Sequence, residues 1–272
     1  MLKTGKLLRL RRLSLAGDGR HLLVPLDHSV SDGPIVPAGE WDDLLRALVD
    51  GGADGIIVHK GRARAFAPDI LRNCALVVHL SASTACSADV HAKVLVADVE
   101  EALRLGADAV SVHVNIGSDT EARQLSDLGA VARSCDAWGM PLIAMVYPRG
   151  PRIEDPRDPA LLAHLANVAA DLGADMVKTS VALPVERMAE VVAGSPIPVL
   201  AAGGPPDGSD LVEYGTAVMA TGCRGLAVGR RIFSAPSPAS LVARLAAVVH
   251  GDGGASNGMS MTSPSTFVAG VA

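Results

Sequence analysis

The sequence predicts an α/β fold of the (β/α)8 TIM-barrel class, on three observations. Eight short apolar runs alternate with helical patterns between residues 21 and 250. Three segments in which a predicted helix ends and a predicted strand begins are nearly alike. They are "GGADGIIVHKG", "LGADAVSVHVNIG" and "LGADMVKTS". In each of them a glycine can end a helix in the left-handed conformation, and the apolar residues that follow begin a strand. No G-x-G-x-x-G follows the first run, which disfavours the alternative of a doubly wound open sheet.

Each predicted strand is a short run rich in Val, Ile, Leu or Ala and closed by polar residues or glycine. In chain order the runs are Leu22–Leu26, Gly55–His59, Leu76–Leu80, Ala109–Asn115, Leu142–Tyr147, Met176–Ser180, Val199–Gly203 and Gly225–Gly229. Helical patterns fall between them, among them "GEWDDLLRALVDGG", "VEEALRLG", "LGAVARSCDAWG" and "DPALLAHLANVAADLG". Regular alternation of this kind indicates βα repeats around a parallel sheet.

Three regions are predicted along the chain. Residues 1–20 are basic and partly apolar, and we expect a short helix that lies on the barrel rather than a targeting peptide. Residues 21–250 make the barrel domain. Residues 251–272 are Gly/Ser-rich and nearly uncharged, which is typical of a flexible tail. No run approaches the roughly 18 apolar residues of a membrane span.

Composition narrows the class of protein further. The chain of 272 residues is 49% hydrophobic but only 3% aromatic, so its core is expected to consist of Ala, Val and Leu. A net charge of -5 argues against nucleic acid or an anionic membrane as a partner. The four cysteines are scattered, with no spacing typical of a zinc site or a disulfide framework. We therefore expect reduced thiols, a cytoplasmic location and no metal.

Lys178 stands in the middle of the apolar run "ADMVKTSVAL", in a chain with only five lysines. A lysine is costly to bury, and burial lowers its pKa, so its amine can act as a nucleophile. A lysine paired with a carboxylate, or one that extends from the end of its strand, is the alternative. The other lysine at a strand end is Lys60, and it follows His59 directly.

The active site of a barrel lies at the carboxyl ends of its strands. Because side chains alternate along a strand, Asp27, Tyr147 and Lys178 converge on one mouth if their faces point inward. The segments "LAAGGPP" and "AVGRRIF" close the last two runs, where barrels commonly hold a phosphate on backbone N–H groups. The candidates are the glycines of these segments, Gly203, Gly204 and Gly229, with Arg230 or Arg231 adding positive charge.

Six segments also resemble one enzyme family in order and over most of the chain. They are "VPLDHSVSDGP", "GADAVSVHVNIGSD", "WGMPLIAMVYPRG", "LGADMVKTS", "AAGGP" and "AVGRRIF". They are similar to the archaeal-type class I aldolases, which include fructose-bisphosphate aldolases and 2-amino-3,7-dideoxy-hept-6-ulosonate synthases. The bacterial branch that condenses dihydroxyacetone phosphate with aspartate semialdehyde, on the route to 3-amino-4-hydroxybenzoate and antibiotic-type secondary metabolites, looks most similar.

The resemblance implies roles for individual residues. Lys178 matches the lysine that forms the Schiff base, Tyr147 the proton donor and Asp27 the proton acceptor. Further expected contacts to the substrate and its phosphate are His28, Ser29, Ser31, Arg149, Gly203, Gly204, Gly229 and Arg230. The implied partners are a small phosphorylated ketone and an amino aldehyde, with no cofactor. A homo-oligomer, specifically a ring-shaped homodecamer, is also implied.

Two departures from the family pattern bear on substrate choice. Ser29 and Asp32 stand where relatives often have Gly and Asn, and "KTSVAL" lacks an aromatic residue that some relatives carry. Asp32 is a candidate for recognising the ammonium group of the amino aldehyde. Arg149 and Arg152 are candidates for a second anion or a carboxylate, or are solvated surface residues.

Other functions remain open at this level. A metal-dependent aldolase or hydrolase is conceivable because four histidines close predicted strands, although no H-x-H or H-E-x-x-H spacing supports it. A barrel that binds ligands without catalysis is a second alternative, since fold does not determine function. The sequence also does not separate an aldol condensation from a transaldolase, because both use the same imine. The four histidines are His28, His59, His79 and His113.

Overall fold

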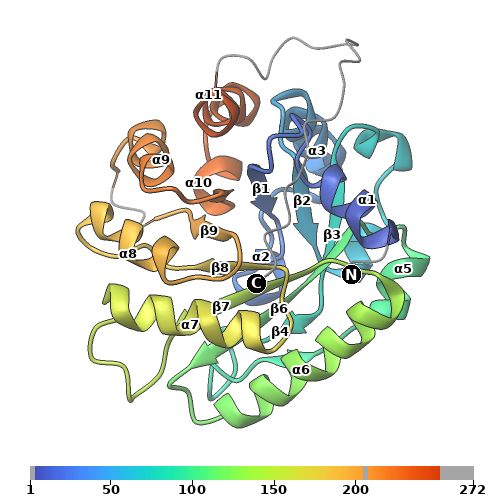
Figure 1. Ribbon diagram of the computed structural model, residues 1–272. Helices are drawn as coiled ribbons and strands as arrows, with labels where there is room; N and C mark the ends of the chain where they lie inside the picture. The colour runs from blue at the N-terminus through green and yellow to red at the C-terminus, as the bar shows by residue number, and fades with distance from the viewer. Residues whose placement is uncertain (1–3, 205–207, 252–272) are drawn as a thin grey trace.

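Eight parallel strands close into a barrel, which confirms the predicted fold class. The computed structural model describes residues 4–204 and 208–251. Around the barrel the strand order is β1-β10-β9-β8-β7-β6-β3-β2. Figure 1 shows the long helices arranged around the outside of these strands. The strands are β1 (His21–Pro25), β2 (Gly55–Val58), β3 (Ala75–His79), β6 (Ala109–Ile116), β7 (Leu142–Pro148), β8 (Met176–Thr179), β9 (Val199–Ala202) and β10 (Gly225–Ala227).

The observed strands differ from the predicted runs by at most two residues at either end. The structure adds a two-stranded antiparallel sheet of β4 (Ser81–Ala82) and β5 (Val94–Leu95). The sequence did not predict this sheet, because strands of two residues are too short to show a periodic pattern. The segment that contains it leaves the barrel after β3 and returns before the next helix, so it lies at the carboxyl end of the strands.

Helices connect successive strands, and several begin at an aspartate that caps the first turn. Asp98, Asp158 and Asp210 accept hydrogen bonds from backbone N–H groups of the helices that follow them. The longer helices are α3 (Trp41–Asp50), α5 (Val99–Arg104), α6 (Glu121–Trp138), α7 (Pro159–Asp171), α8 (Met188–Ala193), α9 (Leu211–Ala220) and α11 (Pro238–His250). Short helical turns lie in the loops, at α2 (His28–Ser31), η1 (Ala38–Glu40), α4 (Lys60–Ala63), η2 (Pro68–Leu71), η3 (Val185–Arg187) and α10 (Arg230–Phe233).

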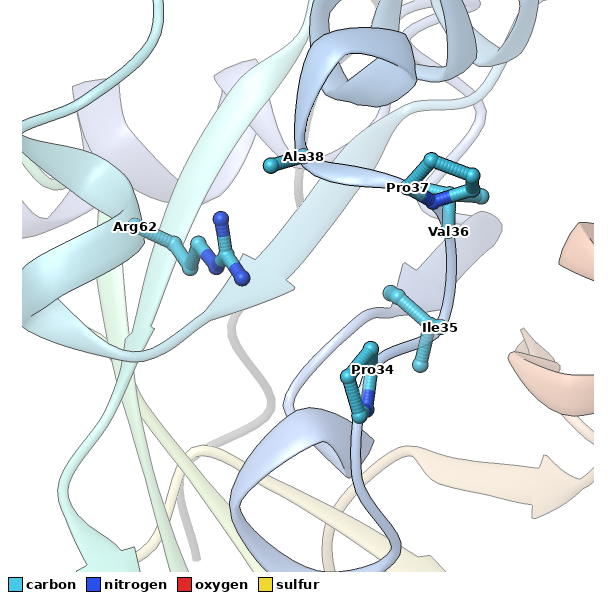
Figure 2. A pocket seen from close by; sticks show the side chains of 6 residues that line it. All are labelled: Pro34, Ile35, Val36, Pro37, Ala38 and Arg62. Carbon is cyan, nitrogen blue, oxygen red and sulfur yellow. The ribbon is translucent and has the colours of Figure 1, made fainter.

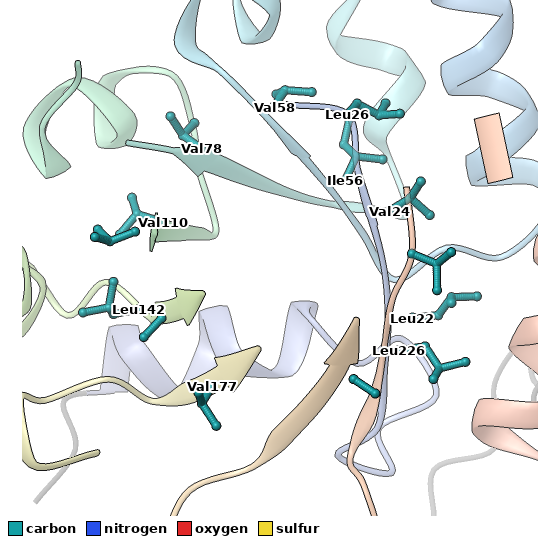
Figure 3. Close-up of a cluster of buried hydrophobic side chains, with 14 of the residues drawn as sticks. Leu22, Val24, Leu26, Ile56, Val58, Val78, Val110, Leu142, Val177 and Leu226 are labelled. Carbon is teal, nitrogen blue, oxygen red and sulfur yellow. The ribbon is translucent and has the colours of Figure 1, made fainter. Parts of the chain in front are cut away.

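Alternation along the strands produces two apolar layers. One layer lies inside the barrel and includes Leu23, Ile143 and Met176. The other lies between the strands and the helices, and Figure 3 shows part of it. Because neighbouring residues of one strand serve different layers, the side chains that the sequence placed on the inner faces do point inward. The labelled side chains of the outer layer are Leu22, Val24, Leu26, Ile56, Val58, Val78, Val110, Leu142, Val177 and Leu226.

The basic N-terminal helix α1 (Thr4–Arg12) packs across the amino-terminal end of the barrel. Lys6 forms a buried ion pair with Asp175 at 2.8 Å, and Arg12 pairs with Asp108 at 3.0 Å. Leu13, which follows the helix, is fully buried in the inner layer. Both aspartates belong to the repeated Gly-Ala-Asp segments that precede strands. Carboxylates of this repeat therefore form ion pairs with basic residues of α1.

The predicted C-terminal tail lies outside the described residues from residue 252 onward. Among the helices in the described part of the chain, none is long and apolar enough to cross a membrane.

Candidate active site

A cavity of about 960 Å³ lies at the carboxyl end of the barrel, and every barrel strand contributes lining residues from the strand itself or from the loop after it. This position agrees with the expectation for a barrel enzyme. Most of the predicted site residues meet there. They are Asp27, His28, Ser31, Tyr147, Arg149, Lys178, Gly203, Gly204, Gly229 and Arg230.

Ser29 is the exception. It lies in α2 and does not line the cavity, whereas His28 and Ser31 do. Residues three apart share one side of a helix, and a residue in the next position is rotated away from that side. Ser29 therefore lies beside the cavity lining rather than in it, and its contact with the substrate stays a prediction.

Lys178 lies on the inner face of β8, and only 8% of the residue is exposed. Its neighbours in the sheet are Met145 of β7 and Leu200 of β9, both members of the inner apolar layer. Lys60 differs, because its amine lies 3.0 Å from a carboxylate oxygen of Glu101 and does not line the cavity. Of the two lysines at strand ends, only Lys178 presents its amine to the cavity.

Asp27 follows β1 and places a carboxylate beside that amine. Its side chain is 19% exposed, with Oδ2 3.7 Å from His79 Nε2 and Oδ1 3.6 Å from His28 Nδ1. Burial raises the pKa of Asp27, but His79, His28 and Lys178 outweigh it and lower the pKa to about 2. Asp27 is therefore ionised at neutral pH. Among the described residues its buried Oδ1 has no hydrogen-bond partner.

Neutral imidazoles line the wall between Asp27 and Tyr147. His79 Nδ1 lies 2.8 Å from Ser111 Oγ, and burial lowers the pKa of His79 to about 4. Burial also lowers the pKa of His59 and of His113. The rings follow one another, with centroids 5.3 Å apart for His59 and His79, 6.5 Å for His79 and His113, and 5.0 Å for His113 and Tyr147.

These histidines were the basis of the metal alternative. Within residues 4–204 and 208–251, no group of three or more His, Cys, Asp or Glu side chains is arranged to hold a metal ion. Their observed neighbours are polar and aromatic groups of the protein, such as Ser111 for His79 and Phe233 for His28.

Tyr147 and Arg149 extend from the end of β7 into the cavity. Tyr147 is 6% exposed, and the guanidinium of Arg149 lies 4.6 Å from the centre of its ring. Arg152 is placed differently, since it pairs with Asp119 at 3.3 Å and donates to the Ser118 carbonyl outside the cavity lining. Of the two arginines proposed for a second anion, only Arg149 is in position.

The predicted phosphate-binding glycines lie next to one another at the ends of β9 and β10. A Cβ on Gly203 would stand 2.8 Å from Val228 Cγ1, and one on Gly229 would overlap the Pro25 carbonyl oxygen. The packing therefore requires glycine at both positions, whatever they bind. Arg230 lies at the rim, where its Nη1 is 3.9 Å from an oxygen of Asp32. Bare backbone and one exposed cation thus occupy this side of the cavity.

Three further lining residues were missed by the sequence analysis, namely Lys93, Arg157 and Tyr214. Lys93 directly precedes β5, and the Tyr214 hydroxyl donates to the Ala202 carbonyl at 2.6 Å. None of the three lies at the end of a predicted strand. The rarity of lysine was the one signal that could have indicated Lys93.

A second pocket of about 530 Å³ lies between the loop of residues 34–38 and Arg62 (Figure 2). The Arg62 guanidinium lies 4.5 Å from the Trp41 ring centre, and the other lining residues are apolar. Without a nucleophile, acid or base, this pocket does not compete with the barrel mouth as a site of chemistry.

A closed (β/α)8 barrel whose inner wall presents a buried amine beside a carboxylate and a phenol defines an enzyme of the Schiff-base type. The chain belongs to the DeoC/LacD family of aldolases, whose model matches residues 21–235. It is therefore a lyase that acts on carbon–carbon bonds.

Individual relatives support this placement. A Streptomyces griseus protein named 2-amino-4,5-dihydroxy-6-oxo-7-(phosphonooxy)heptanoate synthase is 49% identical over 248 residues, which cover 90% of each chain. A Halobacterium salinarum 2-amino-3,7-dideoxy-D-threo-hept-6-ulosonate synthase is 37% identical, covering 93% of this chain and 94% of the relative. A solved structure of a Schiff base-forming fructose-1,6-bisphosphate aldolase superposes with a TM-score of 0.81 at 26% identity, covering 90% of this chain and 99% of that one.

Proposed function

We propose that the protein is a class I aldolase that joins dihydroxyacetone phosphate to L-aspartate 4-semialdehyde through an imine on Lys178. The observation that carries the proposal is the buried Lys178 amine inside a cavity that Asp27 and Tyr147 also line. Lys178 forms no ion pair with the residues that the structure describes, and an amine in that position is suited to attack a ketone carbon. The product would be 2-amino-4,5-dihydroxy-6-oxo-7-(phosphonooxy)heptanoate.

The choice of substrates follows from the product named for the Streptomyces relative. Cleaving that seven-carbon chain between carbons 4 and 5, in the reverse of an aldol addition, yields two fragments. Carbons 5 to 7 are dihydroxyacetone phosphate, and carbons 1 to 4 are aspartate 4-semialdehyde. The identity of 49% over 90% of both chains supports the same pair for this protein.

In the reaction the neutral Lys178 amine adds to the ketone carbon, and loss of water leaves an iminium. The iminium acidifies the neighbouring C–H, and a base in the cavity removes that proton to form an enamine. The enamine carbon attacks the aldehyde carbon, and the new alkoxide takes up a proton. Water then hydrolyses the iminium, which releases the product and restores the amine.

Asp27 and Tyr147 are proposed to handle these protons, with Asp27 as acceptor and Tyr147 as donor. The ionised Asp27 also places a negative charge next to the developing iminium, which stabilises it. Tyr147 is held by its ring contacts with His113 and Arg149, so its hydroxyl is fixed relative to the cavity. Neutral imidazoles around both groups add no positive charge that would oppose the iminium.

The donor phosphate is proposed to bind at Gly203, Gly204, Gly229 and Arg230, on the side of the cavity with bare backbone. His28 and Ser31, on the cavity side of α2, are proposed to contact the donor as well. Fixing the phosphate orients the ketone toward Lys178. A phosphate-binding site would also distinguish the proposed function from a second candidate function, that of the Halobacterium synthase. A 3,7-dideoxy product carries no oxygen on carbon 7, so its donor would not need a phosphate there.

The remaining parts of the proposal concern the setting. We propose a cytoplasmic homo-oligomer that acts on the route to 3-amino-4-hydroxybenzoate in antibiotic biosynthesis. Leu7 and Leu8 of α1 and the nearby Leu15 are between 45% and 52% exposed, which supports a subunit contact at this end of the barrel. Light scattering of the purified protein would measure the number of subunits, and a monomer at micromolar concentration would refute the oligomer.

The central experiment is borohydride reduction of the protein with dihydroxyacetone phosphate in the absence of metal, followed by peptide mass mapping. We expect a stable three-carbon phosphate adduct on Lys178 and none in Lys178→Met. Lys60→Met is the matched control, because Lys60 is the other strand-end lysine and is already paired with Glu101. An active protein that forms no adduct would refute the imine mechanism. An adduct without consumption of aspartate semialdehyde would keep the mechanism and refute the acceptor.

A further inference from the structure

Cations around the cavity differ in whether a carboxylate neutralises them. Arg230 lies 3.9 Å from Asp32, and outside the cavity Lys60 is paired with Glu101. Lys93 and Arg149 both line the cavity, and neither has an ion pair among the residues that the structure describes. Each of them contacts an uncharged group instead. Lys93 contacts the Ser83 hydroxyl, and Arg149 contacts the Tyr147 ring.

Lys93 and Arg149 also lie close enough to repel each other. Burial lowers the pKa of Lys93, and the charge of Arg149 lowers it further. The two charges act together on His113, where burial is the main reason that the pKa is lowered and Lys93 and Arg149 are the next causes. Two like charges near one another are unfavourable until an anion lies between them. An anion bound between Lys93 and Arg149 would therefore relieve this repulsion.

The position of Lys93 is set by the antiparallel sheet that the sequence did not predict. Lys93 precedes β5, and Ser83 follows β4, so the pairing of the two strands brings them together. The Lys93 amine donates to Ser83 Oγ at 2.5 Å, and Ser83 Oγ in turn donates to the Val90 carbonyl at 3.0 Å. The amine is thus held on the wall of the cavity rather than free in solvent.

We propose that Lys93 and Arg149 bind the carboxylate of the amino aldehyde acceptor and so determine its selection. The proposal rests on the proposed function, in which the acceptor is aspartate semialdehyde. The donor phosphate is assigned to the glycine segments after β9 and β10. The anionic end of the acceptor needs a separate partner, and Lys93 and Arg149 supply one beside Tyr147, the group proposed to protonate the new alkoxide.

The neighbouring acids fit the other end of the same molecule. Asp32 lines the cavity, and its charge, like that of Asp27, acts on Lys93. A carboxylate near two cations can receive an α-ammonium group while the cations receive the α-carboxylate. An aldehyde with a single negative charge and no ammonium would use only half of this arrangement.

The test compares acceptors in variants that keep the aliphatic stem of the cation. For Lys93→Met and Arg149→Met we expect KM for aspartate semialdehyde to rise about tenfold to a hundredfold, as for loss of a charged hydrogen bond. With butanal, an uncharged aldehyde of the same length, kcat/KM of Lys93→Met should change less than about threefold. Arg149→Met is judged on KM for aspartate semialdehyde alone, because Arg149 also contacts the Tyr147 ring. In Lys93→Met, borohydride trapping of the dihydroxyacetone phosphate adduct on Lys178 should be unchanged, since the donor is proposed to bind at the glycine segments after β9 and β10. Lys60→Met and Arg152→Met are the matched controls.

The possible outcomes separate the two proposals. If the unaltered protein uses aspartate semialdehyde and Lys93→Met leaves its KM unchanged, the anion site is refuted and the function stands. If the unaltered protein traps the donor but never uses aspartate semialdehyde, the proposed function and the carboxylate assignment fail together. Glyceraldehyde 3-phosphate distinguishes the kind of anion. If Lys93→Met raises KM only for glyceraldehyde 3-phosphate, the carboxylate assignment is overturned. If it raises KM for both acceptors, a site for either anion is supported.

Discussion

Replacing Lys6 by methionine is expected to lower the free energy of unfolding by about 3 kcal/mol. Lys6 and Asp175 form an ion pair at 2.8 Å, and their side chains are 8% and 14% exposed. Removing one partner of a buried pair costs about 3 to 5 kcal/mol, because the remaining charge is left buried. The lower end applies here, since Asp175 keeps its hydrogen bond from the Leu142 N–H at 2.8 Å.

Arg12→Met is the matched control on the same helix. Its partner is another aspartate of the Gly-Ala-Asp repeat, but 67% of the Arg12 side chain is exposed. An exposed pair of this kind contributes about 0.5 kcal/mol. Lys6→Met is therefore expected to lower the free energy of unfolding much more than Arg12→Met, and the difference follows from burial alone.

Urea unfolding, monitored by circular dichroism at two protein concentrations, measures both variants. A lower midpoint with an unchanged m-value would report lost stability rather than an altered unfolded state. The double variant Lys6→Met with Asp175→Asn should recover part of the loss, because no buried charge is left unpaired. Equal losses for Lys6→Met and Arg12→Met, or none for either, would refute the argument from burial.

Three further predictions concern the site and the fold. Tyr147→Phe should lower kcat by about a hundredfold to ten-thousandfold while the donor adduct on Lys178 still forms, as measured by steady-state kinetics and mass mapping; unchanged kcat would exclude proton transfer by the phenol. Burial lowers the pKa of His250, but ion pairs with Asp54 and Asp18 outweigh it and raise the pKa, so the stability that these pairs contribute should be present below about pH 6 and lost as pH rises through the raised pKa. Denaturation of His250→Gln should lack this pH-dependent loss, and an identical pH profile in both proteins would contradict it. Gly229→Ala should reduce both stability and donor trapping, because the added Cβ overlaps the Pro25 carbonyl oxygen; a variant with wild-type melting and trapping would show that the loop moves freely.

Side chains alternate between the two faces of a strand, and this alternation can be seen in the sequence. The sequence alone therefore determined the features that depend on alternation. The eight strands, their inner and outer faces and the convergence of Asp27, Tyr147 and Lys178 on one mouth follow from alternation and from the closed barrel. The glycines after the last two strands were also visible. Their packing against Pro25 and Val228, which makes glycine necessary there, was not.

Which charges are neutralised was decided only by the tertiary structure. No local pattern shows that Lys6 pairs with Asp175 or that Lys60 pairs with Glu101. Nor does one show that Lys93 reaches the cavity without a carboxylate partner among the described residues. The position of Ser29 outside the cavity lining was also decided by the tertiary structure, because a four-residue helix is too short to show which side faces inward. Ion pairs between residues far apart in sequence depend on which side chains the closed barrel brings together, and the alternation along a strand does not specify those partners.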